Sequence, residues 1–483
     1  MAEVVAPRPA AVRRAVLHVV PPFARPGPAL ARHEHVAIVG AGFSGTLLAI
    51  NLLRHGGPRV TLIERRLAFA RGVAFAAGQP GHLLNVRAAN MSALPDQPAH
   101  FAEWLAREGR GVGATFATRH EYGRYLAGLL HETVVDSGGR LVMRQGDVRG
   151  LAWNGDRATL TLDDGPAVRA DAVVLALGNL PPDDPPGFAA AGLAEETYVP
   201  DPWTVDPGRG LKADDTVVVL GTGLTMVDLA VALDDSGFGG RIVAVSRRGL
   251  LPRAHASEAP GATAPLPEVP RETGAALLRR VRNLAGEVGW RAAVDALRPH
   301  TQALWMGAPE AARGRFLRHL RPWWDVHRHR LAPEVAERLQ ALLAEGRLEI
   351  VRAGLTRVTR SRHGVAVELT LRRSGEVRRL DAARIVNCTG PQGDLLRSRE
   401  PLFQRLLDEG AIRPGRHGFG IDVNAHSETI DAHGMANPRL LALGPLTRGT
   451  FWEIVAVPDI RVQAWSVARR MCHAEGFKAA RPA

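Results

Sequence analysis

Cysteine is nearly absent from this chain of 483 residues. The two cysteines, Cys388 and Cys472, lie far apart in the sequence. This excludes a disulfide scaffold, a zinc site built on thiolates and a CxxC redox pair. A reducing, cytoplasmic setting is therefore expected. Long apolar runs are absent as well. None reaches the roughly 18 residues that a membrane-spanning helix needs, so we expect no segment across a membrane.

Lysine is scarce too. Lys212 and Lys478 are the only lysines among 61 basic residues, although the formal net charge is +12. The chain has no lysine-rich tail and no dense basic block, so we do not expect a nucleic acid as partner. Arginine instead suits small anions, which it binds through paired hydrogen bonds. His327 and His329 are one residue apart and would face different ways on a helix, so no metal site is expected.

The strongest motif follows the first predicted strand. His35–Val39 is a short apolar run, and Gly40, Gly42 and Gly45 after it fit the pattern GxGxxG at the start of a helix. The first glycine permits a tight turn, the second lets a pyrophosphate approach the backbone, and the third allows close packing of helix on strand. Glu64 ends the next predicted strand, where an acidic residue would bind a ribose hydroxyl. These features together predict a dinucleotide site.

A second, imperfect glycine motif of the dinucleotide-binding type follows the strand predicted at residues 216–220. Gly221 and Gly223 are in place, but Met226 stands at the third glycine position. We therefore expect the following helix to lie slightly farther from the strand.

At the acidic position of this second start the chain reads Ser246-Arg247-Arg248. No carboxylate is there to repel a 2′-phosphate, and two guanidiniums are there to bind one, which favours NADPH over NADH. The alternative is a solvated, charged strand end.

Two such starts in one chain predict an α/β protein with two Rossmann-like dinucleotide-binding domains, the first for FAD and the second for NADPH. The FAD-binding domain is expected to be discontinuous, with the NADPH-binding domain inserted into it and a helical insertion within the latter. Residues 1–32, rich in Ala, Pro and Arg, are expected to form a disordered leader; Arg13-Arg14 resembles an export signal, but the apolar stretch after it ends too early. The predicted boundaries are 33–205 and 376–475 for the FAD-binding domain, 206–375 for the NADPH-binding domain, 271–346 for the helical insert and 476–483 for a tail.

Several segments point to one family. They are RGVAF at 71–75, GHLLNVRAANMSALP at 81–95, LGPLTRGTFWE at 443–453 and AVPDIR at 456–461. The chain resembles, over nearly all of residues 35–470, the FAD/NAD(P)-binding family that includes bacterial FAD-dependent urate hydroxylases and aspartate N-monooxygenases. The resemblance implies that the 82–92 segment lies along the flavin and that the helix from Pro458 points its positive end at it. Many relatives of the wider class carry Gly-Asp where this chain has Gly444-Pro445, so a contact to the ribityl chain is absent or supplied otherwise.

The motifs and the resemblance together give the candidate cofactor-binding residues. For FAD these are Gly40, Gly42, Phe43, Ser44, Gly45, Glu64, Arg65, Asn85, Met91, Ser92, Val148, Gly178 and Gly444. For NADPH they are Gly221, Gly223, Thr225, Ser246, Arg247 and Arg248.

The expected enzyme is an NADPH-dependent FAD monooxygenase that uses O2 to hydroxylate a small polar or anionic metabolite. The resemblance implies a small anion such as urate or aspartate as substrate, and tryptophans near the expected site favour the planar, urate-like one. One alternative is N-hydroxylation of an amino acid, and another is a flavin reductase or dehydrogenase that does not oxygenate. The candidate catalytic residues are Arg448, Trp452, Arg328 and Trp324. For the stretch 321–330 we also weigh a structural alternative, in which Trp323 and Trp324 are core and the arginines form a solvated face. The sequence leaves the oligomeric state open.

Overall fold

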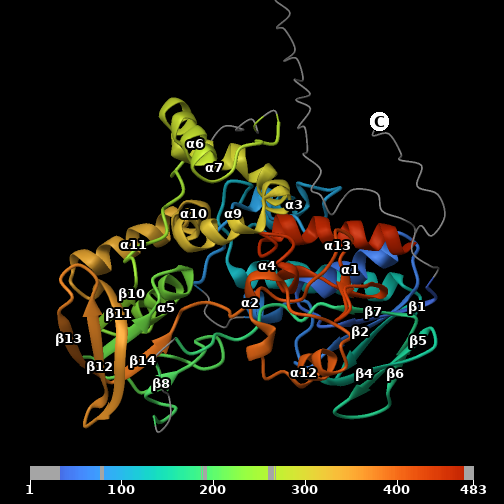
Figure 1. The fold of residues 1–483 in the computed structure, drawn as a ribbon, viewed down its shortest axis with the longest axis horizontal. Helices are drawn as coiled ribbons and strands as arrows, with labels where there is room; N and C mark the ends of the chain where they lie inside the picture. Colours follow the sequence, from blue (N-terminus) through green and yellow to red (C-terminus); the bar gives the residue numbers. More distant parts are fainter. Residues whose placement is uncertain are drawn as a thin grey trace, which may run out of the picture.

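The computed structural model describes residues 33–76, 81–185, 188, 193–258, 266 and 268–472. The predicted leader at 1–32 and the tail at 476–483 lie outside these residues. Within the described part of the chain, no helix combines the length and the apolar character needed to cross a membrane. Figure 1 shows two sheet-containing halves side by side, with a group of helices above them.

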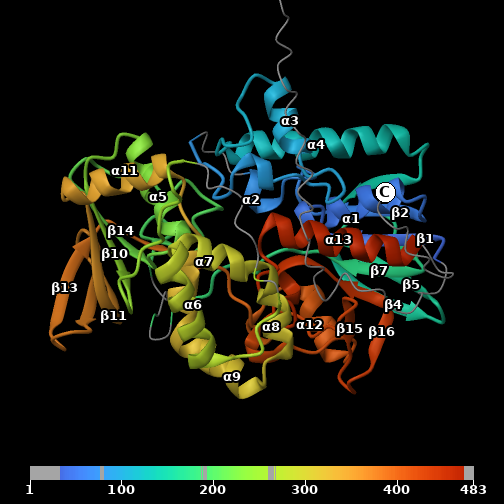
Figure 2. The same ribbon diagram turned by 90° about the horizontal axis from the view of Figure 1, so that it is seen from above.

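The first half is built on a six-stranded sheet in the order β15-β16-β7-β1-β2-β3, parallel except for the β15–β16 pair. Its central strands are continuous apolar runs because both faces of the sheet are covered. Helices α1 and α13 pack against each other over one face (Figure 2). The strands are β1 (His35–Val39), β2 (Arg59–Glu64), β3 (Leu141–Gln145), β7 (Ala172–Leu175), β15 (Glu428–Ile430) and β16 (Ala436–Ala442); the helices are α1 (Phe43–Arg54), α2 (Gly72–Ala76), α3 (His100–Arg107), α4 (Arg119–Asp136), α12 (Pro401–Asp408) and α13 (Val457–Cys472).

A smaller three-stranded sheet, β4-β5-β6, attaches to this half. Its strands are β4 (Val148–Asn154), β5 (Arg157–Leu162) and β6 (Val168–Ala170). Helix α4 begins with a capping box, in which Thr118 accepts from the Glu121 N–H while the Glu121 carboxylate accepts from the Thr118 N–H.

The second half is a seven-stranded sheet in the order β13-β12-β11-β10-β9-β14-β8. Strands β11, β10, β9, β14 and β8 are parallel, and β12 and β13 extend the sheet as antiparallel neighbours. Helices α5 and α11 pack on this sheet, and an apolar core lies between the two helices and the sheet. The elements are β8 (Tyr198–Val199), β9 (Thr216–Leu220), α5 (Leu224–Asp235), β10 (Arg241–Ser246), α11 (Pro333–Ala344), β11 (Leu348–Ser361), β12 (Gly364–Leu371), β13 (Val377–Ala382) and β14 (Arg384–Asn387).

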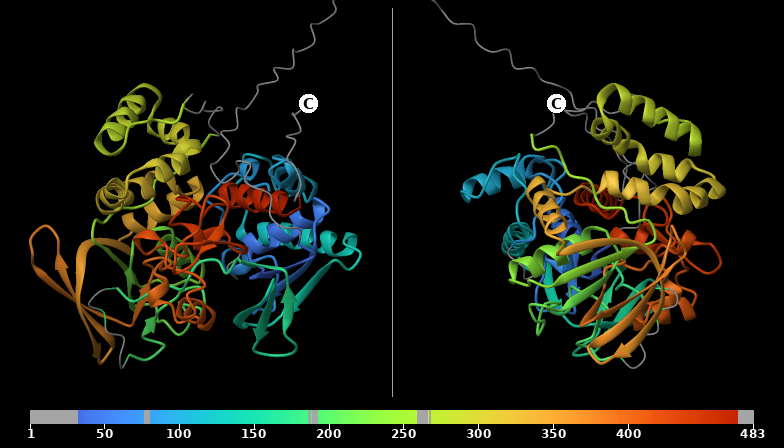
Figure 3. Two further views of the ribbon diagram at one scale, coloured as in Figure 1. Left: turned by 45° about the vertical axis from the view of Figure 1, so that its right-hand side comes forward. Right: turned by 90° about the vertical axis from the view of Figure 1, so that its left-hand side faces the viewer.

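Between β10 and α11 the chain forms the helical insert, which lies over both halves (Figures 1 and 3). Its first helix, α6, has no fully buried residue and projects farthest from the sheets. The insert comprises α6 (Gly274–Val288), α7 (Trp290–Leu297), the 3-10 turn η3 (Arg298–His300), α8 (Thr301–Gly307), α9 (Glu310–Arg315), the π-helical turn η4 (Phe316–Leu320) and α10 (Arg321–Arg328).

Strand pairing moves three of the predicted boundaries. Strand β8 and strands β13 and β14 pair within the second sheet, although the predicted limits at 205 and 376 place them in the FAD-binding domain. Helix α11 packs on α5 and β11, so it belongs to the second domain rather than to the insert. The pairing of β8 with β14 cannot be read from sequence, because parallel pairing joins residues far apart in the chain.

Candidate functional site

The first glycine loop connects β1 to α1. Gly40 has a φ of +100°, and a Cβ there would collide with the carbonyl oxygen of Ala176, just after β7. A Cβ on Gly45 would collide with the carbonyl oxygen of Gly40, so the helix approaches the loop as closely as a glycine allows. Gly42 begins α1 with no side-chain cap and no acidic residue in the first turn. The start of α1 can therefore face a pyrophosphate.

Glu64 lies beside this loop at the end of β2. Its carboxylate accepts hydrogen bonds from the backbone N–H groups of Ala41, at 2.8 Å, and Arg66, at 3.1 Å. The carboxylate is therefore fixed beside the glycine loop, where the sequence predicts a contact with a ribose hydroxyl.

The second glycine loop connects β9 to α5. Gly221 has a φ of +111°, and a Cβ there would collide with the carbonyl oxygen of Cys388. Gly223 begins α5 with no side-chain cap, no acidic residue follows in the first turn, and a Cβ on it would meet no atom within 4 Å. Met226 is fully buried in the core of this half. The loop thus has open space where a phosphate would approach it.

The predicted 2′-phosphate residues lie at the end of β10. The Ser246 hydroxyl contacts the Thr222 hydroxyl at 2.9 Å and accepts from the Gly249 N–H at 3.0 Å. Arg247 is exposed, whereas Arg248 donates to the carbonyl oxygen of Arg318 in the insert, at 3.1 Å. The two arginines are therefore not equivalent, and Arg248 also holds the insert.

Several predicted FAD-site residues converge near the starts of α1 and α13. A Cβ on Gly444, which has a φ of +71°, would collide with the hydroxyl of Ser44. Ser92 is buried, and its carbonyl oxygen accepts from Arg461 of α13 at 2.6 Å. Arg65 instead forms a two-pronged pair with Glu400.

The remaining residues predicted to bind FAD are spread along the same half. The Asn85 carbonyl oxygen accepts from His255 Nε2 at 3.0 Å, and burial lowers the pKa of His255 to about 4. Phe43, Met91 and Val148 are buried, and Gly178 has a φ of +78°.

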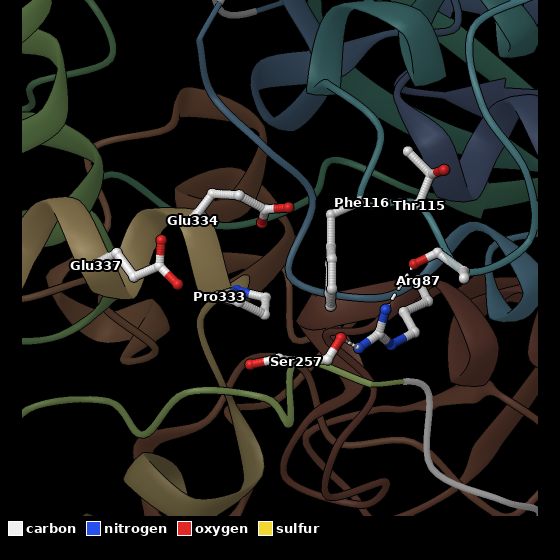
Figure 4. Close-up of a pocket in the computed structure, with 8 residues that line it drawn as sticks. Arg87, Thr115, Phe116, Ser257, Pro333, Glu334 and Glu337 are labelled. Atoms are coloured by element: carbon white, nitrogen blue, oxygen red, sulfur yellow. Dashed lines mark hydrogen bonds between the residues drawn. The ribbon is translucent and has the colours of Figure 1, made fainter.

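Two cavities lie between the two halves. One, of about 360 Å³, has Arg87 on one side, Phe116 in the middle with Ser257 below it, and Pro333 with two glutamates of α11 on the other side (Figure 4). No predicted site residue lines it. The other, of about 350 Å³, is lined by Thr225 of the predicted NADPH site.

Two predicted catalytic residues, Trp324 and Arg328, lie four residues apart on α10 and meet Glu453. Trp324 Nε1 donates to Glu453 Oε1 at 2.8 Å, and Arg328 Nε lies 3.0 Å from Oε2. Glu453 is 2% exposed and has a φ of +68°, a conformation that costs a non-glycine residue about 1–3 kcal/mol. Burial opposes its ionisation, but Arg328 and the Trp324 hydrogen bond outweigh this and lower the pKa of Glu453.

A second ion pair joins the insert to the start of α13. Arg298 of η3 lies 3.5 Å from Asp459 in the first turn of α13. Burial raises the pKa of Asp459, although Arg298 acts in the opposite direction. On α10 itself, Arg321 lies 3.3 Å from Asp325.

Arg448 differs from these three arginines because no described carboxylate pairs with it. Its guanidinium lies over two rings, 4.5 Å from the centre of Trp452 and 5.4 Å from that of Phe419. Its Nε is buried without a hydrogen bond among the described residues. Burial and the neighbouring Arg321 lower the pKa of Arg448 to about 10. Arg448 is thus a buried cation without a carboxylate partner among the described residues.

Aromatic rings pack together beside the Arg448 guanidinium. Trp452 stacks on Trp305 of α8 at 4.7 Å, and Phe316 of the insert packs edge-on against Trp452. We call the following residues the interdomain cluster. They are the three ion-paired arginines with their carboxylates, Arg448 without a described carboxylate partner, and the rings of Trp305, Phe316, Trp324, Phe419 and Trp452. Its charges leave one cation uncompensated, so the cluster suits a small ligand with one acidic group.

The structure brings all four predicted catalytic residues into the interdomain cluster. The structural alternative for the stretch 321–330 is wrong at two positions, since Trp323 is 49% exposed and the Arg328 side chain is 9% exposed. Sequence reasoning missed Glu453 and Asp459, although both stand in the family-like segments. It also missed Arg298, Trp305 and the Arg321–Asp325 pair, for which no local pattern gives a signal.

Comparisons with known proteins agree with this architecture. Residues 37–180 match the family described as FAD-NAD(P)-binding. Among curated proteins, none matches the chain by sequence. The chain thus contains an FAD/NAD(P)-binding domain, and the predicted resemblance to such proteins is confirmed.

Solved structures of two monooxygenases and one N-hydroxylase are similar over nearly the whole chain. L-lysine 6-monooxygenase from Pseudomonas syringae has a TM-score of 0.63 at 18% identity, covering 92% of this chain and 100% of its own. Ornithine N-hydroxylase from Kutzneria sp. 744, solved with reduced FAD, NADP+ and L-ornithine, has a TM-score of 0.62 at 17% identity, covering 91% and 99%. The FAD-bound cadaverine monooxygenase DfoA from Erwinia amylovora has a TM-score of 0.63 at 13% identity, covering 94% and 99%.

The family match and these likenesses confirm the predicted α/β fold with two Rossmann-like dinucleotide-binding domains. The predicted cofactors, FAD and NADPH, and the predicted oxidoreductase class agree with them. A urate-like substrate finds no support in these comparisons, and the amino-acid alternative fits them better.

Proposed function

We propose that this chain is an NADPH-dependent FAD monooxygenase that hydroxylates the nitrogen of a small amine carrying one acidic group. The observation that carries the proposal is the fold, shared over more than nine tenths of the chain with enzymes that hydroxylate ornithine, lysine and cadaverine. The urate-like substrate, favoured by the tryptophans, gives way to the amino-acid alternative.

The residues present fit both cofactors. Each glycine loop leads into a helix that has no side-chain cap and no acidic residue in its first turn. Gly223 also has open space beside it. Such helix starts favour phosphate groups. Arg247 and Arg248, at the end of β10, would hold the 2′-phosphate of NADPH. When bound, FAD would supply the redox chemistry, accepting a hydride from NADPH and reacting with O2.

The interdomain cluster supports the choice of an acidic amine. Arg448 would bind the substrate carboxylate, and the rings of Trp452 and Phe419 would exclude water around it. The Arg328–Glu453 pair and Trp324 would hold α10 against the segment that carries Arg448. A free diamine would leave the Arg448 charge uncompensated, so we expect amino acids to be preferred over diamines.

Purified protein, reconstituted with FAD, tests the proposal. We expect bound FAD, NADPH oxidation that is stimulated by a member of a panel of amino acids, and oxygen uptake in step with it. Urate and cadaverine are the comparison substrates, and a quinone under anaerobic conditions tests the reductase alternative. Full-rate quinone reduction without any stimulation by an amine would contradict the proposal.

A further inference from the structure

Gln302, on α8 of the insert, is a buried amide without partners. The residue is 4% exposed. Its Oε1 and its Nε2 are both buried, and neither makes a hydrogen bond to any residue that the structure describes. Buried polar side chains are normally hydrogen-bonded, and leaving one unpaired costs about 1–3 kcal/mol, so an amide with both ends unpaired points to a missing ligand.

The neighbours of Gln302 on the same helical face show where the amide points. The turn just before α8 reaches the same region, since Arg298 of η3 pairs with Asp459. Trp305, three residues after it, donates to the Gly449 carbonyl oxygen at 3.0 Å, and Met306 packs against the core of the FAD-binding half. Residues three and four apart on a helix share one face. The Gln302 amide therefore faces the segment from 449 to 459, which leads into α13.

The same segment carries a buried carboxylate. Asp459, in the first turn of α13, has Arg298 of η3 as its ion-pair partner, with Oδ2 lying 3.5 Å from the guanidinium. The start of α13 also contacts the 82–92 segment through Arg461 and Ser92. Gln302 thus lies where the insert meets the elements expected to surround the flavin ring.

We propose that Gln302 binds a ligand that presents a hydrogen-bond donor and an acceptor side by side, the edge of a carboxamide or a cyclic imide. A primary amide offers the complementary acceptor and donor. Two molecules of the proposed function carry this chemistry, the pyrimidine ring of FAD and the carboxamide of NADPH. The inference rests on the proposed function only for the choice of these two ligands.

Equilibrium binding measurements show which of the two ligands, FAD or NADPH, contacts Gln302. Gln302→Leu keeps a similar volume but forms no hydrogen bond, and Gln340→Leu, at an exposed position of α11, is the matched control. FAD binding to apoprotein is measured by flavin fluorescence, and NADP+ binding to the oxidised FAD-loaded protein by calorimetry. We expect Gln302→Leu to weaken one of the two ligands about tenfold and to leave the other unchanged, as loss of a hydrogen-bonding partner predicts. The control should bind both like the wild type.

Thermal unfolding of the apoprotein separates a binding role from a structural one. Because Leu removes an unpaired amide, the apoprotein of Gln302→Leu should melt no lower than the wild type. Unchanged binding of both ligands, or equal weakening of both with a lower melting temperature, would overturn the inference. If the Leu variant fails to fold, Gln302→Met provides the same test. Failure of the wild type to bind FAD or NADP+ would instead contradict the proposed function.

Discussion

Replacing Arg448 by methionine separates its cost to folding from its role in binding. Methionine keeps an apolar stem over Trp452 and Phe419 but removes the charge. Burial holds the pKa of Arg448 near 10, below the ordinary arginine value. A decrease of this size corresponds to roughly 3 kcal/mol against the charged form in the folded protein. Arg448→Met should therefore make the apoprotein more stable by up to about 3 kcal/mol at pH 7.

The pH dependence has a defined sign. A cation whose pKa is lowered by folding destabilises the protein at every pH below its folded pKa, and this effect fades as the pH rises through that value. The stability advantage of Arg448→Met should therefore shrink above about pH 10. Denaturant unfolding of the apoprotein at pH 7 and pH 10.5 measures it, with the exposed Arg416→Met as control.

The same variant should bind substrate poorly. Each charge-assisted hydrogen bond to a carboxylate contributes about 1.5–3 kcal/mol, so the KM for the amino acid should rise about 10- to 100-fold. FAD content should not change, and peroxide release should increase. Arg448→Lys should recover only part of the loss, because a point charge lacks the planar fork. An apoprotein that is destabilised, together with an unchanged KM, would refute the reasoning.

Three further predictions concern the other parts of the site. Glu453→Gln should destabilise the protein by about 3 kcal/mol and raise peroxide release, because it leaves Arg328 without its buried partner; Glu349→Gln, at a more exposed ion pair, should do neither, and equal effects of both would contradict this role. The double variant Arg247→Ala, Arg248→Ala should raise the KM for NADPH at least tenfold and leave NADH nearly unaffected, whereas equal losses would show that the arginines are only surface residues. Gly42→Asp should yield protein without FAD, because a carboxylate would face the pyrophosphate, and retention of FAD by this variant would place the flavin elsewhere.

Local patterns were enough to predict the fold. A strand, a glycine loop, a helix and a second strand within 30 residues leave little choice of structure, so the starts at Gly40 and Gly221 are readable from sequence. The sequence also showed that Met226 stands where the GxGxxG motif has its third glycine. The neighbours of β8 and β14 were not, because their pairing depends on residues nearly 200 positions apart.

The interdomain cluster was only partly predictable. Adjacent residues on a helix point about 100° apart, so only the docked partner decides that Trp324 reaches Glu453 while Trp323 faces solvent. Arg448 stands out because no described carboxylate pairs with it, and this depends on how the insert packs. Gln302 gives no sequence signal at all, since a single glutamine in a helix is ordinarily a surface residue.

The central claim is that an oxygen atom from O2 is transferred to a substrate nitrogen. The direct measurement uses ¹⁸O-labelled oxygen and the amine that most stimulates NADPH oxidation, with mass spectrometry of the product. The account predicts one labelled hydroxylamine for about each NADPH consumed, with little peroxide. NADPH oxidation that yields only peroxide or reduced quinone, with no label in any amine of the panel, would contradict it.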